Sequence, residues 1–468
     1  MYNERVFSKA VKEKRRNLMK KERNMLSGPL AWPLVTYAIP IMLTSVLQLL
    51  FNAADLIVVG RFCGSISVAA VGSTGAITNL IVNLFIGLSV GAGVAVAHGI
   101  GGREEQAVFR TVHTAVPTAA LSGLFLTVVG VALSGEILVA MATPEDVLPL
   151  AKLYMEIYFL GITFNMIYNF CASMVRAAGD TQSPLIILTA AGVLNVILNI
   201  VFVRYVGMNV DGVALATILS EGLSAVAIVW VMTRRTDSCK LELKKMHIYG
   251  EPLVKMLRIG VPAGIQASMF SASNVVIQSA VNSFGAVAVS GNAAVSNLEG
   301  FMYVIENAFH QTAVNYVGQN SGAMQYGRVK KISWFCMGYA VIAGIVAGFA
   351  MVYFGPQLLG LYITDSQEAI SIGMARMVVT ILPYFLFGLQ DVVTGVLRGM
   401  GASFLSMIIT VLGICGMRIV WIYTIFQIPA YHTQECLYLS YPISWVVTFI
   451  VQMIAFTVVF RKAERRAA

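Results

Sequence analysis

Residues 51–62 read FNAADLIVVGRF and lie inside a long apolar run that starts near Ala31. The run keeps one carboxylate, Asp55, about halfway along its length. A charge at the centre of a membrane-spanning helix costs about 3 kcal/mol on insertion scales. A charged residue with this free-energy cost is expected either to be stabilised by a partner or to have a function. The residues around Asp55 must therefore be identified before its role is inferred.

Apolar runs of this kind make up most of the chain. Of its 468 residues, 57% are hydrophobic and 12% are charged, whereas soluble domains are about 25% charged. The mean hydropathy is +0.77. A membrane-spanning helix needs roughly 20 apolar residues. Runs of about that length or more cover residues 31–58, 67–98, 107–135, 147–177, 184–203, 211–233, 252–283, 287–318, 331–360, 368–398, 405–426 and 437–460. We therefore predict an all-α membrane protein with twelve transmembrane helices, because barrel strands alternate over roughly 10 residues.

The distribution of basic residues predicts the orientation. With the N-terminus inside, 27 of the 32 Lys and Arg residues lie on the cytoplasmic side or at adjoining helix ends, which is a positive-inside pattern. The exceptions are Arg61, Lys152, Arg204, Arg376 and Arg418. We expect a multi-pass protein of the cell membrane, embedded in the lipid bilayer as a monomer, with both termini cytoplasmic. The net charge of +9 then reflects topology and gives no support to nucleic-acid binding.

The chain divides at its midpoint, where residues 234–251 form a long polar connection. Arg176 and Gly179 in SMVRAAGDTQSP recur 222 residues later as Arg398 and Gly401 in GVLRGMGASFLS, and weak repeats are typical of transporters. Six spans per half predict two six-helix bundles related by a pseudo-two-fold axis along the membrane normal. The predicted parts are a basic cytoplasmic tail over 1–30, an N-lobe over 31–233, a cytoplasmic linker over 234–251, a C-lobe over 252–460 and a basic cytoplasmic tail over 461–468.

The sequence lacks the motifs of several classes of enzymes and pumps. The sequence contains no Gly-Lys dipeptide and hence no phosphate-binding P-loop, and none of its five His residues is followed by Glu, as zinc proteases require. The six cysteines show no metal-ligand spacing. We expect no enzyme, no cofactor and no certain metal site, and a secondary transporter fits better than a pump.

The chain resembles the multidrug and toxic compound extrusion family over nearly its whole length. The resemblance is carried by NAADLIVVGR (52–61), MVRAAGDTQSP (174–184), NVILNIVFV (195–203), DGVALAT (211–217), VGQNSGAMQYGRVKK (317–331) and GVLRGMGAS (395–403). It implies twelve helices in two lobes. It also implies export of organic cations or other amphipathic compounds in exchange for protons or sodium ions.

Polar residues of the first half gather around Asp55 in this scheme. Gln48 and Asn52 precede it on the same helix face, and Asn195 and Asn199 form an i,i+4 pair. The resemblance implies that an N-lobe cavity is lined by Gln48, Asp55, Asn169, Asn195, Asn199 and Thr217. A poorly solvated pocket favours the neutral form of a carboxyl group, so we expect Asp55 to exchange protons. The individual Asn and Thr residues also fit simple interhelical packing links.

The second half has acids of its own. Glu299 and Glu306 share a helix face, and Asp391 corresponds to Asn169 at the repeat offset. Some family members use carboxylates in this lobe for cation binding, so these three are candidates for a second cation or substrate site. Approach to an aqueous helix end is the alternative for each of them.

The coupling ion and the substrate are open at this stage. Some relatives carry Asp where this chain has Asn199, and because sodium prefers several oxygen ligands we favour protons over sodium. The intramembrane charges are read as mostly acidic, which favours cationic substrates. The rivals are a lipid-linked oligosaccharide flippase, which a cavity rich in Arg would favour, and a non-transporting membrane scaffold or receptor.

Overall fold

The computed structural model describes residues 25–141, 143–364 and 366–467, so residues 1–24 of the predicted basic tail lie outside it. Within these ranges the chain forms helices and turns and no strand. The first half comprises α2 (Ala31–Phe62), α3 (Ser65–Gly101), α4 (Glu105–Ala140), α5 (Leu148–Ala177), α6 (Gln182–Ile200), η1 (Val201–Val206) and α7 (Val210–Thr233). The second half comprises η2 (Leu243–Lys245), α8 (Gly250–Asn282), α9 (Ala286–Gly322), α10 (Tyr326–Tyr353), α11 (Gly355–Gly360), α12 (Gln367–Thr380), α13 (Phe385–Gly399), α14 (Ser403–Thr410), η3 (Val411–Gly416), α15 (Met417–Tyr423), η4 (Ile425–Gln427), η5 (Pro429–Tyr431) and α16 (Gln434–Ala467).

The predicted all-α membrane architecture is confirmed. In the described part of the chain, 9 helical segments are long and apolar enough to cross a membrane, and α12 with α13 forms a further span bent by 47°. The other two predicted spans correspond to α8, with 33 residues, and α9, with 37 residues. Both are long enough to cross a bilayer but carry more polar side chains. Their polar residues line the central cavity described below.

The internal repeat is visible in the backbone. Gly179 and Gly401, the pair found in the sequence, both have positive φ angles, of 93° and 81°. Gly64 and Gly285 precede α3 and α9 with nearly identical dihedrals, φ 90° and ψ 176° against φ 85° and ψ 176°. Only glycine adopts such angles without strain, so the same turns are specified at the same places in both halves.

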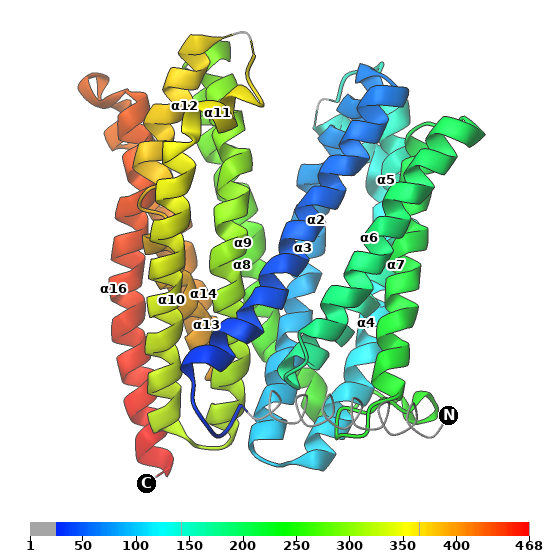
Figure 1. Ribbon diagram of the computed structural model, residues 1–468, viewed down its shortest axis with the longest axis vertical. Coiled ribbons are helices and arrows are strands. Elements are labelled where there is room, and N and C mark those ends of the chain that lie inside the picture. Colours follow the sequence, from blue (N-terminus) through cyan, green and yellow to red (C-terminus); the bar gives the residue numbers. More distant parts are fainter. Residues whose placement is uncertain (1–24, 142, 365, 468) are drawn as a thin grey trace, which may run out of the picture.

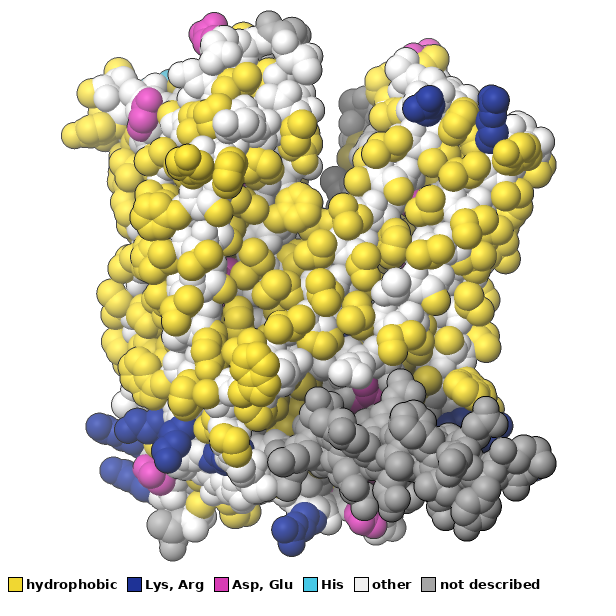
Figure 2. All heavy atoms as spheres, viewed as in Figure 1, with side chains coloured by type: hydrophobic (Ala, Val, Ile, Leu, Met, Phe, Trp, Pro, Cys, Tyr) yellow, Lys and Arg dark blue, Asp and Glu magenta, His cyan; other side chains and the backbone are white. Residues whose placement is uncertain are grey.

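The helices form two columns that separate toward one end of the molecule (Figure 1). Helices α2 to α7 make up the right-hand column and α8 to α16 the left-hand one, and α16 ends at the closed lower end. Figure 2 shows a cleft between the columns in the upper half and hydrophobic side chains around both of them. Basic side chains gather below this hydrophobic surface, at the lower left.

The two columns pack closely where α3 crosses α8, with backbone against backbone. A Cβ atom on Gly87 would overlap the backbone of Gly264, and one on Gly91 would overlap the backbone of Met256. A Cβ atom on Gly260 would lie 2.6 Å from the Cα atom of Leu88. Small residues allow helix backbones in membranes to approach this closely, so these glycines fix the seam between the halves.

Polar contacts close the lower end below the cavity. His98 Nε2 on α3 lies 2.7 Å from the carbonyl oxygen of Gly399 on α13. Gln319 Nε2 on α9 donates to the carbonyl oxygen of Ala177 on α5 over 2.7 Å. Each bond joins one half to the other, so the lower end is held shut while the upper end is open.

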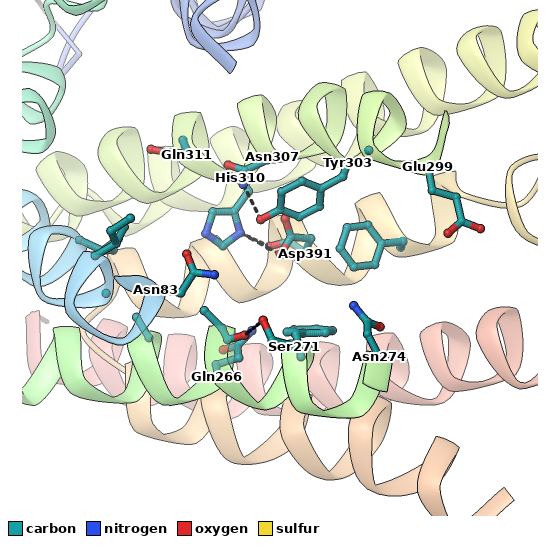
Figure 3. Close-up of a pocket in the computed structure, with 18 of the residues that line it drawn as sticks. Asn83, Gln266, Ser271, Asn274, Glu299, Tyr303, Asn307, His310, Gln311 and Asp391 are labelled. Atoms are coloured by element: carbon teal, nitrogen blue, oxygen red, sulfur yellow. Dashed lines mark hydrogen bonds and ion pairs between the residues drawn. The ribbon is translucent and has the colours of Figure 1, made fainter. Parts of the chain in front are cut away.

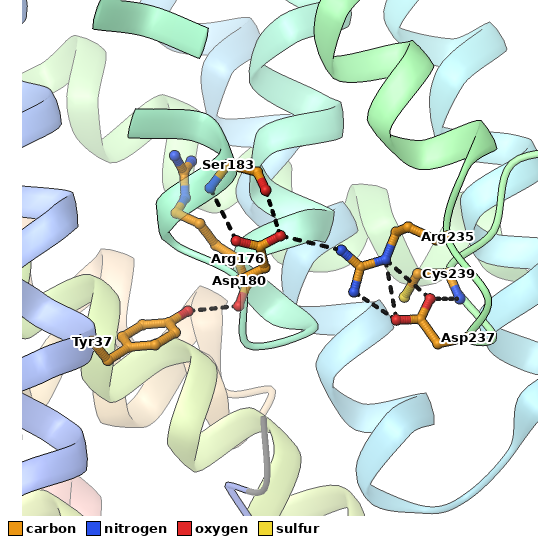
Figure 4. A network of polar contacts seen from close by, with 7 residues as sticks. All are labelled: Tyr37, Arg176, Asp180, Ser183, Arg235, Asp237 and Cys239. Atoms are coloured by element: carbon orange, nitrogen blue, oxygen red, sulfur yellow. Dashed lines mark hydrogen bonds and ion pairs between the residues drawn. The ribbon is translucent and has the colours of Figure 1, made fainter. Parts of the chain in front are cut away.

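The connection between the halves folds back onto the lower end of the first half (Figure 4). Arg235 binds Asp237 at 2.6 Å and pairs with Asp180 at 3.6 Å. The Cys239 backbone N–H donates to Asp237 over 3.1 Å, and the Cys239 side chain is buried. Further along, the backbone N–H of Glu242 donates to His113 Nε2 over 3.0 Å. The connection is therefore docked on the protein rather than extended into solvent.

Candidate functional site

The polar cluster predicted around Asp55 forms between α2, α6 and α7. Asn199 donates one hydrogen bond to Asp55 Oδ1 and another, of 3.2 Å, to Asn195 Oδ1. Asn195 lies 3.4 Å from the Thr217 hydroxyl. Asn199 is fully buried and Asp55 partly so. The i,i+4 pair thus bridges a carboxyl group on one helix to a hydroxyl group on another.

Two of the residues predicted for this cluster are not hydrogen-bonded to it. Gln48 and Asn52 are exposed on α2, and none of the hydrogen bonds among the described residues links them to Asp55. The helical spacing placed them on the correct helix. However, Asp55 turns toward α6, and the side chains one and two turns earlier face the surface.

A second carboxyl group stands nearby in the first half. Glu221 on α7 accepts a hydrogen bond of 2.7 Å from Asn165 on α5. Asn165 in turn accepts one of 2.8 Å from Asn169, which had been assigned to the cavity lining. Asn165 was not predicted as a site residue, although its i,i+4 spacing to Asn169 places both side chains on one helix face.

A cavity of about 710 Å³ lies between the halves and is walled mainly by the second. Its lining comes from α3 and α5 on one side and from α8, α9, α12, α13, α15 and α16 on the other. Among the predicted residues, Asn169, Glu299 and Asp391 line it. The lining as found excludes Asp55 and Glu306. The cavity and the Asp55 cluster are therefore separate polar regions.

Asp391 belongs to a network on the cavity wall (Figure 3). Its carboxylate lies 3.2 Å from His310 Nδ1. On the other side of the ring, Arg398 lies 3.4 Å from His310 Nε2 and donates to Gln266 Oε1 over 2.8 Å. The network therefore links α9, α13 and α8 with one acid, one imidazole and one guanidinium group.

Glu299 is held as an ion pair. Arg376 Nη2 lies 2.8 Å from Glu299 Oε2, and the Thr380 hydroxyl donates to Oε1 over 2.7 Å. Arg376 also donates to Asn292 Oδ1 over 2.9 Å. The partners of Glu299 thus come from α12, and its charge is compensated inside the protein.

Glu306 lies behind the wall in a tightly packed position. Its side chain has an exposed fraction of 0%, and in the described structure neither carboxylate oxygen has a hydrogen-bond partner. Cβ atoms on Gly344 or Gly388 would overlap its carboxylate. Burying an unpaired carboxylate is far costlier than burying a neutral carboxyl group, so the site suits the protonated form.

The charge of the cavity differs from the expectation. The cavity is lined by four arginines, Arg176, Arg376, Arg398 and Arg418, against two carboxylates, Glu299 and Asp391. The reading of the intramembrane charges as mostly acidic is wrong for this cavity. The positive-inside count placed Arg176 and Arg398 at cytoplasmic helix ends and left Arg376 and Arg418 as exceptions. All four side chains line the cavity.

Among the described residues, no group of three His, Cys, Asp or Glu side chains is arranged to hold a metal ion. The polar wall instead offers guanidinium, amide and carboxyl groups beside aromatic rings. The lining is rich in amide, hydroxyl and charged side chains, and several aromatic rings stand among them.

Comparison with known proteins agrees with this arrangement. The family model described as MatE matches residues 40–201 and again residues 262–424. The two matches start 222 residues apart, which is the offset of the repeat in the sequence. One family model therefore accounts for each half separately.

Individual relatives extend over nearly the whole chain. It is 25% identical over 448 residues to the probable multidrug resistance protein YoeA of Bacillus subtilis, covering 94% of this chain and 96% of that protein. It is 22% identical over 375 residues to the multidrug export protein MepA of Staphylococcus aureus, covering 80% and 82%. An outward-facing multidrug resistance MATE family transporter has the same fold, with a TM-score of 0.87, 20% identity and 95% and 99% coverage. This chain belongs to the MatE family and is a multi-pass membrane transporter.

Proposed function

We propose that the protein is a secondary active antiporter that exports amphipathic small molecules in exchange for protons by alternating access. The family relationship and the multidrug relatives support export of small molecules. The cleft at one end and the sealed seam at the other support a single central site that is exposed to one side at a time.

The observation that carries the coupling is the environment of Asp55. Its partner is the neutral amide of Asn199 rather than a cation, so its charge is not compensated by an ion pair in the described structure. Protonation removes such a charge without any metal. An amphipathic cation would compete with the proton for this carboxylate, and competition between two ligands for one state couples their movements.

Sodium remains the alternative coupling ion. Glu221 supplies a second carboxyl group in the membrane-spanning part of the first half, which weakens the argument that Asn199 leaves the N-lobe with too few acids. However, Glu221 is bonded to Asn165, and its hydrogen bonds are separate from those that join Asp55 to Asn199 and Asn195. This separation supports the proton over a shared metal site.

The substrate class has mixed support. The carboxyl groups of the first half support organic cations as substrates, because they can bind a positive charge. The arginines of the cavity give specific support to a second candidate, a lipid-linked oligosaccharide flippase, whose substrates carry pyrophosphate. The family model and the multidrug relatives favour the exporter.

Counterflow in liposomes tests the proposal. Purified protein is reconstituted, and dye movement is followed with a pH gradient alone in sodium-free buffer and then with a sodium gradient alone. We expect transport with the pH gradient. Transport driven by sodium and indifferent to pH would overturn the proton assignment, and movement of lipid-linked sugar without any gradient would favour the flippase.

A further inference from the structure

One wall of the cavity is an aromatic cluster. Tyr384, Phe387 and Trp445 lie with ring centroids 5.1 to 5.9 Å apart, and Tyr441 contacts Trp445 at 6.0 Å. All four rings line the cavity. Rings in such offset and edge-on arrangements form a rigid apolar surface that suits a planar ligand.

Arg418 stands within this aromatic wall. Its guanidinium carbon lies 4.0 Å from the centroid of the Tyr441 ring and 5.8 Å from that of Trp445. Its Nε donates to the Ser444 hydroxyl over 3.1 Å. The side chain is 4% exposed and lines the cavity. Ring contacts and one hydroxyl therefore hold the guanidinium group at the cavity surface.

The charge of Arg418 is not matched by an acid. Among the described residues, the ion pairs of the cavity join Arg376 to Glu299 and His310 to Asp391, and none includes Arg418. Both carboxylates of the cavity lining, Glu299 and Asp391, are already paired with other side chains. A guanidinium group has five donors, and an unmatched charge inside a membrane protein is costly. An anion in the cavity would supply the missing partner.

The same geometry disfavours a cation at this wall. Aromatic faces attract cations, but the carbon of the Arg376 guanidinium already lies 5.8 Å from the Tyr441 centroid, and that of Arg418 lies 4.0 Å from it. Since Arg376 is paired with Glu299, a further positive charge would meet the unpaired guanidinium group of Arg418 in a poorly solvated space, where like charges repel strongly.

We propose that Arg418, framed by Tyr441 and Trp445, binds the anionic group of an amphipathic aromatic ligand while the neighbouring rings hold its apolar body. The inference rests on the proposed function, because it names a substrate class for the central cavity. A carboxylate, a sulfonate or a phosphate would each accept paired hydrogen bonds from the terminal nitrogens of a guanidinium group.

A series of naphthalene compounds tests this proposal by calorimetric titration of the full chain in detergent. The probes are 2-naphthoate, 2-naphthalenemethanol and 2-naphthyl phosphate, which share one ring system and differ in charge. We expect naphthoate to bind at least about tenfold more tightly than the neutral alcohol, the difference typical of a charge-assisted bond. Equal affinities of the two compounds for the unsubstituted protein would overturn the proposal.

Substitutions test whether a preference for naphthoate over the neutral alcohol depends on Arg418. Arg418→Gln is expected to remove the advantage of naphthoate over the alcohol, and Arg418→Lys is expected to keep part of it. The matched control is Arg204→Gln, because Arg204 also lies over an aromatic ring, 5.6 Å from Phe62, but is absent from the cavity lining. A preference that survives in Arg418→Gln, or that disappears equally in Arg204→Gln, would contradict the proposal.

The phosphate compound separates two sources of the anion. Tighter binding of 2-naphthyl phosphate than of 2-naphthoate supports a phosphate-bearing lipid, and equal or weaker binding supports a carboxylate or sulfonate amphiphile. Both results support the anion site. The titration uses no gradient, so a failed anion preference and a failed proton coupling are detected independently.

Discussion

At the scale of single residues, the molecule places its intramembrane charges in two different environments. Asp55 is bonded to an amide in the first half, and Arg418 is stacked on rings in the second. A carboxylate whose partner is neutral can be neutralised by a proton without breaking an ion pair. A guanidinium group, in contrast, stays charged at all physiological pH values. The first environment suits exchange of a proton, and the second suits permanent attraction of an anion.

Replacing Asp55 by Asn tests the first environment. The variant Asp55→Asn keeps the size and hydrogen bonding of the side chain but cannot exchange a proton. We expect counterflow driven by a pH gradient to fall to the level of protein-free liposomes, with a melting temperature equal to or above that of the unsubstituted protein, because a costly charge is removed.

The matched control for this variant is Asp146→Asn, since Asp146 is exposed at the turn before α5. It should transport dye at the normal rate. Export at the normal rate by purified Asp55→Asn protein would contradict the proposed role of Asp55.

The sequence predicted the acids of this molecule better than its arginines. Asp55 and Asn199 were identified because an acid in an apolar run and an i,i+4 amide pair are visible without a structure. Arg418 was noted only as an exception to the positive-inside pattern, and its place in the cavity was not predicted. Its role depends on Tyr441 and Trp445, which come from α16, and such contacts between distant segments are not encoded in local spacing.

At the scale of helices, the seam between α3 and α8 depends on the absence of side chains. Gly264 packs so closely that an added Cβ atom would overlap the backbone around Leu84. Overfilling a packed contact costs about 1–3 kcal/mol. The seam is formed in the conformation described here, so a bulky residue at this position raises the free energy of this conformation.

We therefore expect Gly264→Val to lower the thermal midpoint of the purified protein and to shift the molecule away from the open cleft. Thermal unfolding and spin-label distances between the upper ends of the two columns measure these effects. The control is Gly338→Val on α10, where an added Cβ atom meets nothing within 4 Å. Equal midpoints and equal distances for both variants would show that the seam does not stabilise the open conformation.

The docked connection between the halves makes a separate prediction about Cys239. Burial raises the pKa of its thiol to about 12, against an ordinary value of about 8.5. The fraction of reactive thiolate at pH 8 is then roughly a thousandfold lower than for an exposed cysteine. With the other five cysteines replaced, we expect Cys239 to react very slowly with a maleimide.

Loosening the connection should expose this thiol. Asp237→Ala removes the acceptor that binds both Arg235 and the Cys239 backbone, so faster labelling is expected. Glu242→Ala is the control, because Glu242 pairs with Lys245 on the surface and exposed pairs contribute little to stability. Rapid labelling of Cys239 before any substitution would mean that the connection is not docked in solution.

At the scale of the whole molecule, the number of spans and the repeat were predictable, but the location of the cavity was not. Apolar runs and the offset of 222 residues are properties of the sequence itself. The cavity is formed by helices of both halves. Glu299 and Asp391 line it, whereas Glu306 is buried outside its lining. Glu299 and Glu306 share one helix face, so spacing alone does not distinguish them.

The last prediction concerns the side to which the molecule opens. The cleft lies at the end opposite to the C-terminal end of α16 (Figures 1 and 2), and the positive-inside pattern predicts that this terminus lies in the cytoplasm. We therefore expect the cavity described here to face outward. In a cysteine-free background, Ser271→Cys, on the cavity wall, should react with a membrane-impermeant maleimide in right-side-out vesicles. Thr236→Cys, in the connection between the halves, should react in everted vesicles. Labelling of both from the same side, or of each from the opposite side, would contradict the topology or the direction of opening.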